Sequence, residues 1–92
     1  MVQFEFDPEK SKSNKLKHGI DFEQAQELWN FPGLVARSDR GDDVRFVRIA
    51  PTVEGIFWTA AFAKRGDKVR IISVRRSRKE EREAYERKTE GG

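Results

Sequence analysis

Residues 56–74, with the sequence IFWTAAFAKRGDKVRIISV, decide the fold of this chain of 92 residues. The run 56–63 is mostly apolar, which is typical of a central strand that is buried on both faces. The tripeptide 65–67 (RGD) is a tight-turn sequence, and residues 68–74 then resume a strand pattern. Strands joined by so short a turn pair antiparallel, so the segment predicts a β-hairpin in the middle of a sheet.

Further strands are predicted on the N-terminal side of this hairpin. Residues 44–50 (VRFVRIA) and the shorter run 34–37 (LVAR) have the composition of strands. Residues 2–6 (VQFEF) alternate apolar and polar side chains, which indicates a first strand with one apolar face. The short connections between the later strands favour an antiparallel meander.

A first helix is predicted directly after the first strand. Asp7 can cap its free N–H groups, and Pro8 suits the first helical position because it has no N–H to satisfy. The helix should run to about His18, with Gly19 in the left-handed conformation that ends it. Leu16 is essentially its only apolar side chain, so we expect the helix to lie shallowly on the core.

A second helix is predicted to begin at Asp21, which forms a capping-box pattern with Gln24. The sequence 30–33 (NFPG) should break it. Its buried face is defined by apolar residues at helical spacing, which are Phe22, Ala25, Leu28 and Trp29. We interpret these residues as part of the core rather than as ligands.

A last helix is predicted from the capping-box pattern of Ser77 and Glu80, and it should end near Lys88. The fold class is therefore α+β: a small antiparallel β-sheet with an N-terminal strand, two N-terminal helices and one C-terminal helix packed on it, mainly on one face. We expect a single domain over residues 1–88 and a disordered tail at 89–92.

The composition limits the kinds of site that the chain can build. It has no cysteine and one histidine, which excludes disulfides and thiolate zinc sites and makes a metal cofactor unexpected. A site made only of carboxylates stays open. The sequence has neither the pattern of a signal peptide nor a run of about 20 apolar residues. We therefore expect a cytoplasmic protein without a membrane partner.

Basic residues are concentrated in one part of the chain, although the net charge is only +3. Between positions 64 and 79 one acidic residue, Asp67, stands among eight basic ones, which are Lys64, Arg65, Lys68, Arg70, Arg75, Arg76, Arg78 and Lys79. The segment 80–90 that follows carries five glutamates against three bases. This segregation favours a polyanion-binding face beside a solvated helix. The alternative is a surface that only keeps the protein in solution.

The arginines on the predicted strands point to phosphate chemistry. The chain lacks a glycine-rich phosphate loop, a paired-histidine zinc motif and a nucleophile elbow. An arginine on a sheet needs solvent, a counter-charge or a ligand, and its planar fork matches phosphate oxygens. Each arginine could instead pair with a glutamate. Several arginines that converge would favour the binding of a nucleic acid.

RNA can be cleaved without a metal ion, because its 2′-hydroxyl can attack the adjacent phosphorus. An enzyme must then transfer protons and stabilise charge on the phosphoryl oxygens, tasks that histidine, lysine and arginine can share. His18, the only histidine, suits such a role because imidazole exchanges protons near neutral pH. At the end of a helix it could equally cap free carbonyl groups, and both interpretations stay open.

The chain contains, in order, a strand, Asp7-Pro8, Asn14, the run 17–20 (KHGI), the run 22–25 (FEQA), the strand 44–50 (VRFVRIA) and the segment 69–86 (VRIISVRRSRKEEREAYE). Together these motifs span nearly the whole chain. They resemble the BrnT family of ribonuclease toxins from bacterial type II toxin–antitoxin systems.

The resemblance implies a RelE-like fold and metal-independent RNA cleavage that blocks translation, with no cofactor. It also implies an antitoxin with a ribbon-helix-helix DNA-binding domain, through which the complex would bind operator DNA. On the matching positions it implies these catalytic candidates: Lys17, His18, Arg45, Arg65, Arg75 and Tyr85. The expected RNA-binding residues are Lys15, Arg70, Ser73 and Arg76.

Each catalytic candidate is assigned a role as a hypothesis. We expect His18 to act as general acid or base, and Lys17 and Arg45 to bind phosphate. Either Arg65 or Arg75 should stabilise charge in the transition state.

The chain departs from the pattern of the family at one point. Val44 stands where the family often has glutamate, and the segment 34–44 contains arginines where acidic residues are usual, so no carboxylate base is expected there. Tyr85 could reach the site from the last helix or could be a packed tyrosine. The alternative functions are a nucleic-acid-binding module without chemistry and a protein-interaction module whose basic face an acidic partner covers.

Overall fold

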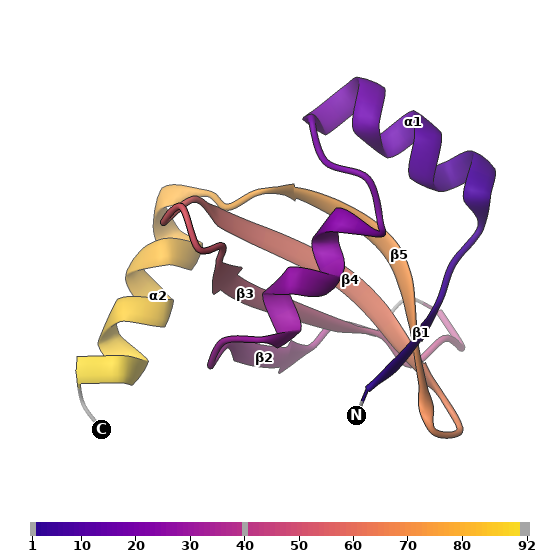
Figure 1. The fold of residues 1–92 in the computed structure, drawn as a ribbon. Coiled ribbons are helices and arrows are strands. Elements are labelled where there is room, and N and C mark those ends of the chain that lie inside the picture. Colours follow the sequence, from indigo (N-terminus) through magenta and orange to yellow (C-terminus); the bar gives the residue numbers. More distant parts are fainter. Residues whose placement is uncertain (1, 40, 91–92) are drawn as a thin grey trace.

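The computed structural model describes residues 2–39 and 41–90 and contains a five-stranded sheet with helices around it (Figure 1). The strands lie side by side in the order β1-β5-β4-β3-β2. The elements follow the chain as β1 (Gln3–Glu5), α1 (Pro8–His18), the 3₁₀ helix η1 (Gln24–Trp29), β2 (Leu34–Arg37), β3 (Phe46–Pro51), β4 (Phe57–Arg65), β5 (Lys68–Arg76) and α2 (Lys79–Glu90). The predicted α+β class is confirmed. The predicted disordered tail at 89–92 begins inside α2, and residues 91 and 92 lie outside the described residues.

The structure confirms the central hairpin. β4 and β5 pair antiparallel, from Trp58 opposite Arg76 to Arg65 opposite Lys68. Gly66 in the turn has a φ of +61°, a left-handed conformation that glycine adopts without strain. Because residues opposite each other share a face, this register decides which side chains of the two strands lie together.

The prediction of an antiparallel sheet was wrong for one strand, because β1 pairs parallel with β5. Gln3 lies opposite Lys68, and Glu5 lies opposite Arg70. A short turn forces antiparallel pairing only on strands that are neighbours in sequence. β1 joins β5 across most of the chain, so no turn sets its direction and the sheet is mixed.

The second helical segment has the predicted capping box but a tighter helix. The Asp21 N–H donates to Gln24 Oε1 at 3.0 Å, and the Gln24 N–H donates to Asp21 Oδ1 at 2.7 Å. Hydrogen bonds fix both ends of the segment. Before η1 begins, the Phe22 N–H donates to the Ser11 hydroxyl, and near its end Arg48 donates to the Leu28 carbonyl. A 3₁₀ helix rises about 2.0 Å per residue against about 1.5 Å for an α-helix, so η1 reaches further between these two anchors.

The hydrophobic core lies between η1 and one face of the sheet. Its largest fully buried side chains are Phe22, Leu28, Ile71 and Val74. Edge-to-face contacts extend the core, since the Trp29 ring lies 5.2 Å from Phe4 and 5.3 Å from Phe62. Burying one such side chain stabilises the fold by about 1.5–3 kcal/mol.

α2 lies against the opposite face of the sheet, so the prediction that the helices share one face was wrong. Trp58 and Ala60 of β4 belong to the core under η1. Thr59 lies between them, points to the other face and donates a hydrogen bond to Glu81 of α2 at 3.1 Å. Successive residues of a strand point to opposite faces, and β4 is buried on both.

Polar residues, rather than Leu16, fasten α1 to the sheet. The expectation was a helix that lies shallowly on the core because Leu16 is essentially its only apolar side chain. Leu16 is 90% exposed, and the buried residues of α1 are the polar Ser11 and Asn14. The Asn14 side-chain amide donates to the carbonyls of Ile20 at 2.8 Å and Val74 at 2.9 Å, and Asn14 Oδ1 accepts from the Val74 N–H at 3.2 Å. α1 therefore lies along the edge of β5, beyond the end of β1.

The start of α2 differs from the predicted capping box. Glu81, rather than Glu80, reaches back and accepts a hydrogen bond from the backbone N–H of Arg78 at 2.7 Å. The hydroxyl of Ser77 instead shares a 2.8 Å hydrogen bond with Thr59. The contact with the sheet thus moves the start of the helix by one residue. None of the described helices is long and apolar enough to cross a membrane.

Candidate nucleic-acid interface

The sheet face opposite η1 carries a shallow cavity of about 220 Å³. Three of its lining residues are cross-strand neighbours, since Val47 of β3 lies opposite Ala61 of β4, which lies opposite Ser73 of β5. Ala61 and Ser73 have short side chains, which leave space for the cavity above the sheet. Arg45, just before β3, lines the same cavity.

A second cavity, of about 400 Å³, adjoins the first and shares Arg45 with it. Ala63 and Arg70 lie opposite each other across β4 and β5 and both line it. The basic residues of its lining are Lys10, Arg45, Lys64, Arg65 and Arg70. The two cavities together are named the arginine basin. It brings together four of the predicted site residues: Arg45, Arg65, Arg70 and Ser73.

Two arginines of the basin have carboxylate neighbours at its rim. Arg70 Nη1 lies 2.8 Å from Glu5 Oε2, a pair that follows from the parallel pairing of β1 with β5. Arg45 Nη2 lies 3.4 Å from Asp43 Oδ2, whose side chain is 70% exposed. Such an exposed pair contributes at most about 1 kcal/mol, so a phosphate could replace Asp43 at little cost.

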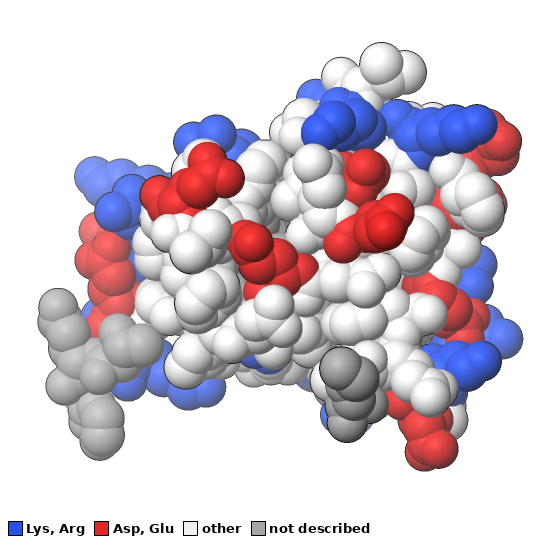
Figure 2. Space-filling model, viewed as in Figure 1, with Lys and Arg blue, Asp and Glu red and all other residues white. Residues whose placement is uncertain are grey.

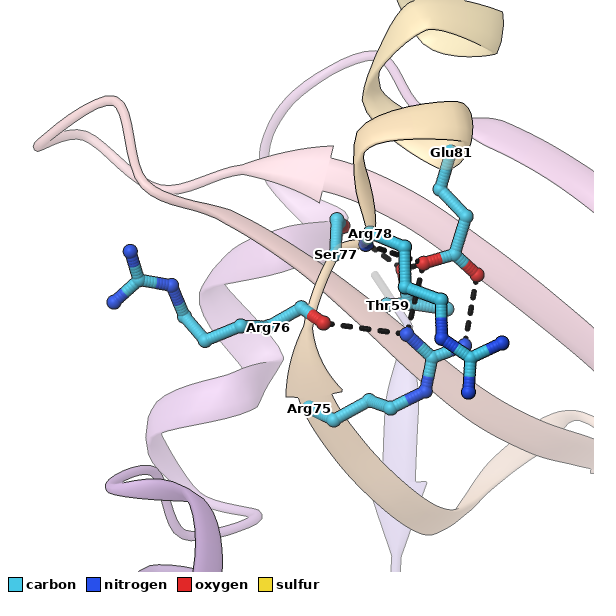
Figure 3. Close-up of polar contacts among 6 residues, drawn as sticks. All are labelled: Thr59, Arg75, Arg76, Ser77, Arg78 and Glu81. Carbon is cyan, nitrogen blue, oxygen red and sulfur yellow. Dashed lines mark hydrogen bonds and ion pairs between the residues drawn. The ribbon is translucent and has the colours of Figure 1, made fainter.

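Arg75 lies two residues after Ser73 on β5, at the end of the basin beside α2 (Figure 3). Its Nη1 and Nη2 atoms each donate to one carboxylate oxygen of Glu81 at 2.8 Å. Glu81 also accepts from the Arg78 N–H and the Thr59 hydroxyl. Led by the hydrogen bond from Arg75, these contacts lower the pKa of Glu81 from 4.5 to about 2, against the opposing effect of burial. The same hydrogen bond raises the pKa of Arg75.

Acid should destabilise the protein through Glu81. Because the pKa of Glu81 is depressed in the folded state, its contribution is present above about pH 4.5 and is lost as the pH falls toward about 2. We expect the free energy of unfolding to fall by about 1–2 kcal/mol from this group alone. Urea unfolding at about pH 6 and about pH 3 measures the change. Glu81→Gln should show a smaller fall over that interval, and an equal fall would contradict the assignment.

Lys17 and His18 lie outside the arginine basin. Gly19 ends α1 as predicted, with a φ of +83° and its N–H donating to the Lys15 carbonyl at 2.9 Å. The ammonium group of Lys15 donates to Gln24 at 2.9 Å, while Lys17 and His18 are exposed. None of these three side chains is among the residues that line the two cavities of the basin.

The direction of α1 places its last turn near the far end of β5. Lys10, near the start of α1, lines the basin, and Asn14, one turn later, bonds Val74. The helix therefore runs along β5 in the direction of the strand. Its last turn, which ends at His18, lies toward the end of β5 that carries Arg75.

Arg76 and Tyr85 lie apart from the basin and have structural contacts. The Arg76 guanidinium lies 5.5 Å from the ring centre of Trp58, on the η1 face of the sheet. The Tyr85 hydroxyl donates to the Pro32 carbonyl at 3.2 Å, and its ring packs edge-to-face on Phe57 at 5.0 Å. Tyr85 thus joins α2 to the segment before β2.

The face that carries η1 has a different charge from the basin. Figure 2 shows that face as mostly uncharged, with acidic side chains in its middle and basic ones toward its rims. The acidic residues that line cavities there include Glu23, Glu27 and Glu54. The lining of the basin's larger cavity has five basic residues against two acidic ones, Asp42 and Asp43, so the basin suits a polyanion better than the acidic centre of the η1 face does.

The sequence did not single out Arg48 or Glu81. Arg48 donates to the Leu28 carbonyl at 3.0 Å and the Phe31 carbonyl at 2.7 Å, and burial lowers the pKa of its guanidinium. It caps η1, on the sheet face opposite the basin that Arg45 lines. Glu81 could have been found as the carboxylate at the third position of α2. Within residues 2–39 and 41–90, no group of three or more His, Cys, Asp or Glu residues could hold a metal ion.

Comparison with known proteins identifies the family of the chain and a solved structure with a similar fold. Residues 6–81 match the family described as "Ribonuclease toxin, BrnT, of type II toxin-antitoxin system". Among solved structures, the chain is similar to the crystal structure of the Brucella abortus ribonuclease toxin, BrnT, with a TM-score of 0.63 and 21% sequence identity. That similarity covers 86% of this chain and 100% of the other. No curated protein matches the sequence.

Proposed function

Because the chain belongs to the BrnT family of ribonuclease toxins of type II toxin–antitoxin systems, we propose that it is an endoribonuclease that cleaves RNA without a metal ion. The observation that carries this proposal is the arginine basin. Arg45, Arg65 and Arg70 converge there over a floor of small residues, and each can offer a planar fork to phosphate oxygens. The reaction would be attack of the ribose 2′-hydroxyl on the adjacent phosphorus, which releases the 5′-oxygen.

The proposed roles follow the position of each residue. Arg45 binds phosphate where the two cavities meet, and Arg65 or Arg75 stabilises the charge that develops on the phosphoryl oxygens. His18 transfers a proton, with Lys17 beside it. Because the last turn of α1 lies toward the end of β5, an RNA strand bound in the basin would have to cross the edge of β5 to meet His18.

The chemistry is tested by incubating the purified protein with single-stranded RNA in excess EDTA. We expect cleavage, with products that end in a 2′,3′-cyclic phosphate. RNA that is bound but not cleaved would support a nucleic-acid-binding module instead. Cleavage that stops in EDTA and returns with added magnesium would overturn the metal-independent mechanism.

Substitution of His18 tests proton transfer. His18→Ala should lower the rate of cleavage by about 100-fold, and Lys17→Ala should lower it by about 10-fold. The exposed position of both residues predicts little change in the free energy of unfolding. The rates are measured on the same RNA in EDTA, with Lys12→Ala on α1 as the matched control. If both variants cleave as fast as the parent, the proton donor and acceptor lie elsewhere.

The family also implies an antitoxin partner. We propose that it carries a ribbon-helix-helix domain, and that the complex binds operator DNA through this domain. The proposed effect of RNA cleavage is inhibition of translation in the cytoplasm. We also propose that the fold is RelE-like, which the order of a first strand, two helices and an antiparallel meander supports.

A further inference from the structure

We propose that Glu81 is a positioning residue for RNA binding, which turns Arg75 so that one edge of its guanidinium grips a phosphodiester. This inference rests on the proposed function, because it takes RNA as the ligand of the basin. Glu81 itself does not touch the RNA. It acts on Arg75, which lies near the end of β5, close to the start of α2 (Figure 3).

The hydrogen bonds of Arg75 leave one edge of the guanidinium unoccupied. Both hydrogens of Nη1 are engaged, one by Glu81 Oε1 at 2.8 Å and the other by the Arg76 carbonyl at 3.2 Å. One hydrogen of Nη2 is engaged by Glu81 Oε2. The remaining donors are the Nε–H and the outer hydrogen of Nη2, and no acceptor among residues 2–39 and 41–88 takes them.

These two remaining hydrogens point in the same direction. Nη2 lies on the side of the guanidinium that carries the Nε–H, so the pair forms a parallel fork of the kind that binds two oxygens of one phosphate. The side chain of Arg75 is 33% exposed, so a ligand can reach it. Glu81 therefore occupies the end of the guanidinium and leaves its side edge to RNA.

Glu81 can orient Arg75 because it is itself held in place. Its Oε1 atom accepts from the backbone N–H of Arg78 at 2.7 Å and from the Thr59 hydroxyl at 3.1 Å. Thr59 is in turn fixed by a 2.8 Å hydrogen bond with Ser77. The carboxylate is thus tied to the start of α2 and to the centre of β4. A guanidinium held this way loses little rotamer freedom when it binds a phosphate.

A phosphodiester fits this fork better than a carboxylate of a protein partner would. Arg75 follows Ser73 on the same face of β5, and Ser73 lines the basin beside Arg45. The phosphates of an RNA strand repeat at regular intervals, so one strand could contact the basin and Arg75 together. The carboxylates on the surface of a folded acidic protein have no such regular spacing.

The test uses single-stranded RNA with 2′-O-methyl groups, which cannot be cleaved, and the ¹⁵N–¹H signals of arginine Nε–H groups. In the parent protein, the Arg75 signal, assigned from its loss in Arg75→Lys, should shift as this RNA is added. Glu81→Gln keeps an oxygen for the Arg78 N–H but loses the charge that holds the guanidinium. We expect it to bind the RNA about 10-fold more weakly and to lose the Arg75 shift.

Two controls separate positioning from stability. Phe57→Leu weakens the packing of α2 on β4, where the Phe57 ring contacts Tyr85 and Arg82, without touching the contacts of Glu81. Glu86→Gln removes an exposed ion pair with Arg82 on the same helix. Both should bind within about 2-fold of the parent. Arg75→Lys keeps the charge but lacks the fork, and it should bind at least as weakly as Glu81→Gln.

Each outcome decides one proposal. An Arg75 signal that does not shift, or Glu81→Gln binding as tightly as the parent, overturns the inference. Weakening by Phe57→Leu equal to that by Glu81→Gln also overturns it, because the packing of α2 on the sheet would then be the cause. If the parent binds methylated RNA through Arg75 but leaves unmodified RNA intact, the proposed ribonuclease activity fails and the positioning role stands.

Discussion

Replacing Arg45 by alanine is expected to lower the rate of RNA cleavage by about 100-fold or more, with little change in the free energy of unfolding. Arg45 is the cation that both cavities of the basin share, so its loss removes a hydrogen-bond donor to phosphate from both. Its ion pair with Asp43 is long, at 3.4 Å, and exposed on the carboxylate side. The folded state therefore depends little on it.

The matched control is Arg37→Ala, which removes the same charge from β2. Arg37 lies opposite Phe46 and pairs with the carboxylate of Asp39 at 2.9 Å, outside the lining of the basin. We expect this variant to cleave within about 3-fold of the parent, since only long-range attraction is lost. Cleavage is measured on a defined single-stranded RNA in EDTA, at two salt concentrations. Equal losses in the two variants would mean that general charge, rather than the basin, binds the RNA.

Replacing Asn14 by alanine is expected to lower the free energy of unfolding by about 3 kcal/mol. The Asn14 side chain is 7% exposed and makes three hydrogen bonds to backbone groups of Ile20 and Val74. Truncation removes these bonds and leaves buried N–H and C=O groups with less than full pairing. For a small domain that is stable by about 5–15 kcal/mol, such a loss is large.

Leu16→Ala on the same helix provides the comparison. Leu16 is 90% exposed, so its truncation should change the free energy of unfolding by no more than about 0.5 kcal/mol. Urea unfolding at neutral pH measures both variants. If Leu16→Ala destabilises the protein as much as Asn14→Ala does, then α1 is held by apolar packing and the amide bonds are secondary.

Features that depend on neighbours in sequence could be predicted from the sequence. The hairpin around Gly66, the helix ends at Asp7 and Gly19 and the capping box of Asp21 all follow from residues a few positions apart. The parallel pairing of β1 with β5 could not be predicted from the sequence, because no local turn sets the direction of β1. The attachment of α1 was also hidden, since an exposed leucine and a buried asparagine reverse the usual rule of burial.

The site was predictable to the extent that it lies on strands. Alternation across the paired strands brings Arg70, opposite Ala63, to the face that Arg45 borders. Ser73 is three positions from Arg70, so alternation alone predicts the opposite face, and the irregularity in register between Ala61 and Phe62 brings it to the same one. The capping contact of Glu81 with the Arg78 N–H is local and could have been found, but its bonds to Arg75 and Thr59 depend on where α2 meets the sheet, which the sequence does not report. His18 is not among the residues that line the basin, so its catalytic role remains a prediction that the variants of His18 test.

The two hydrogen bonds between the Asn14 amide and Val74 make one side chain act as a short piece of strand. An amide group carries the same donor and acceptor as a peptide unit, so the outer edge of β5 is also paired at Val74, beyond the end of β1. An unpaired sheet edge invites strands from other molecules. Asn14 thereby guards against edge-to-edge aggregation, and a chain without it would be at risk at high concentration even if the monomer still folded.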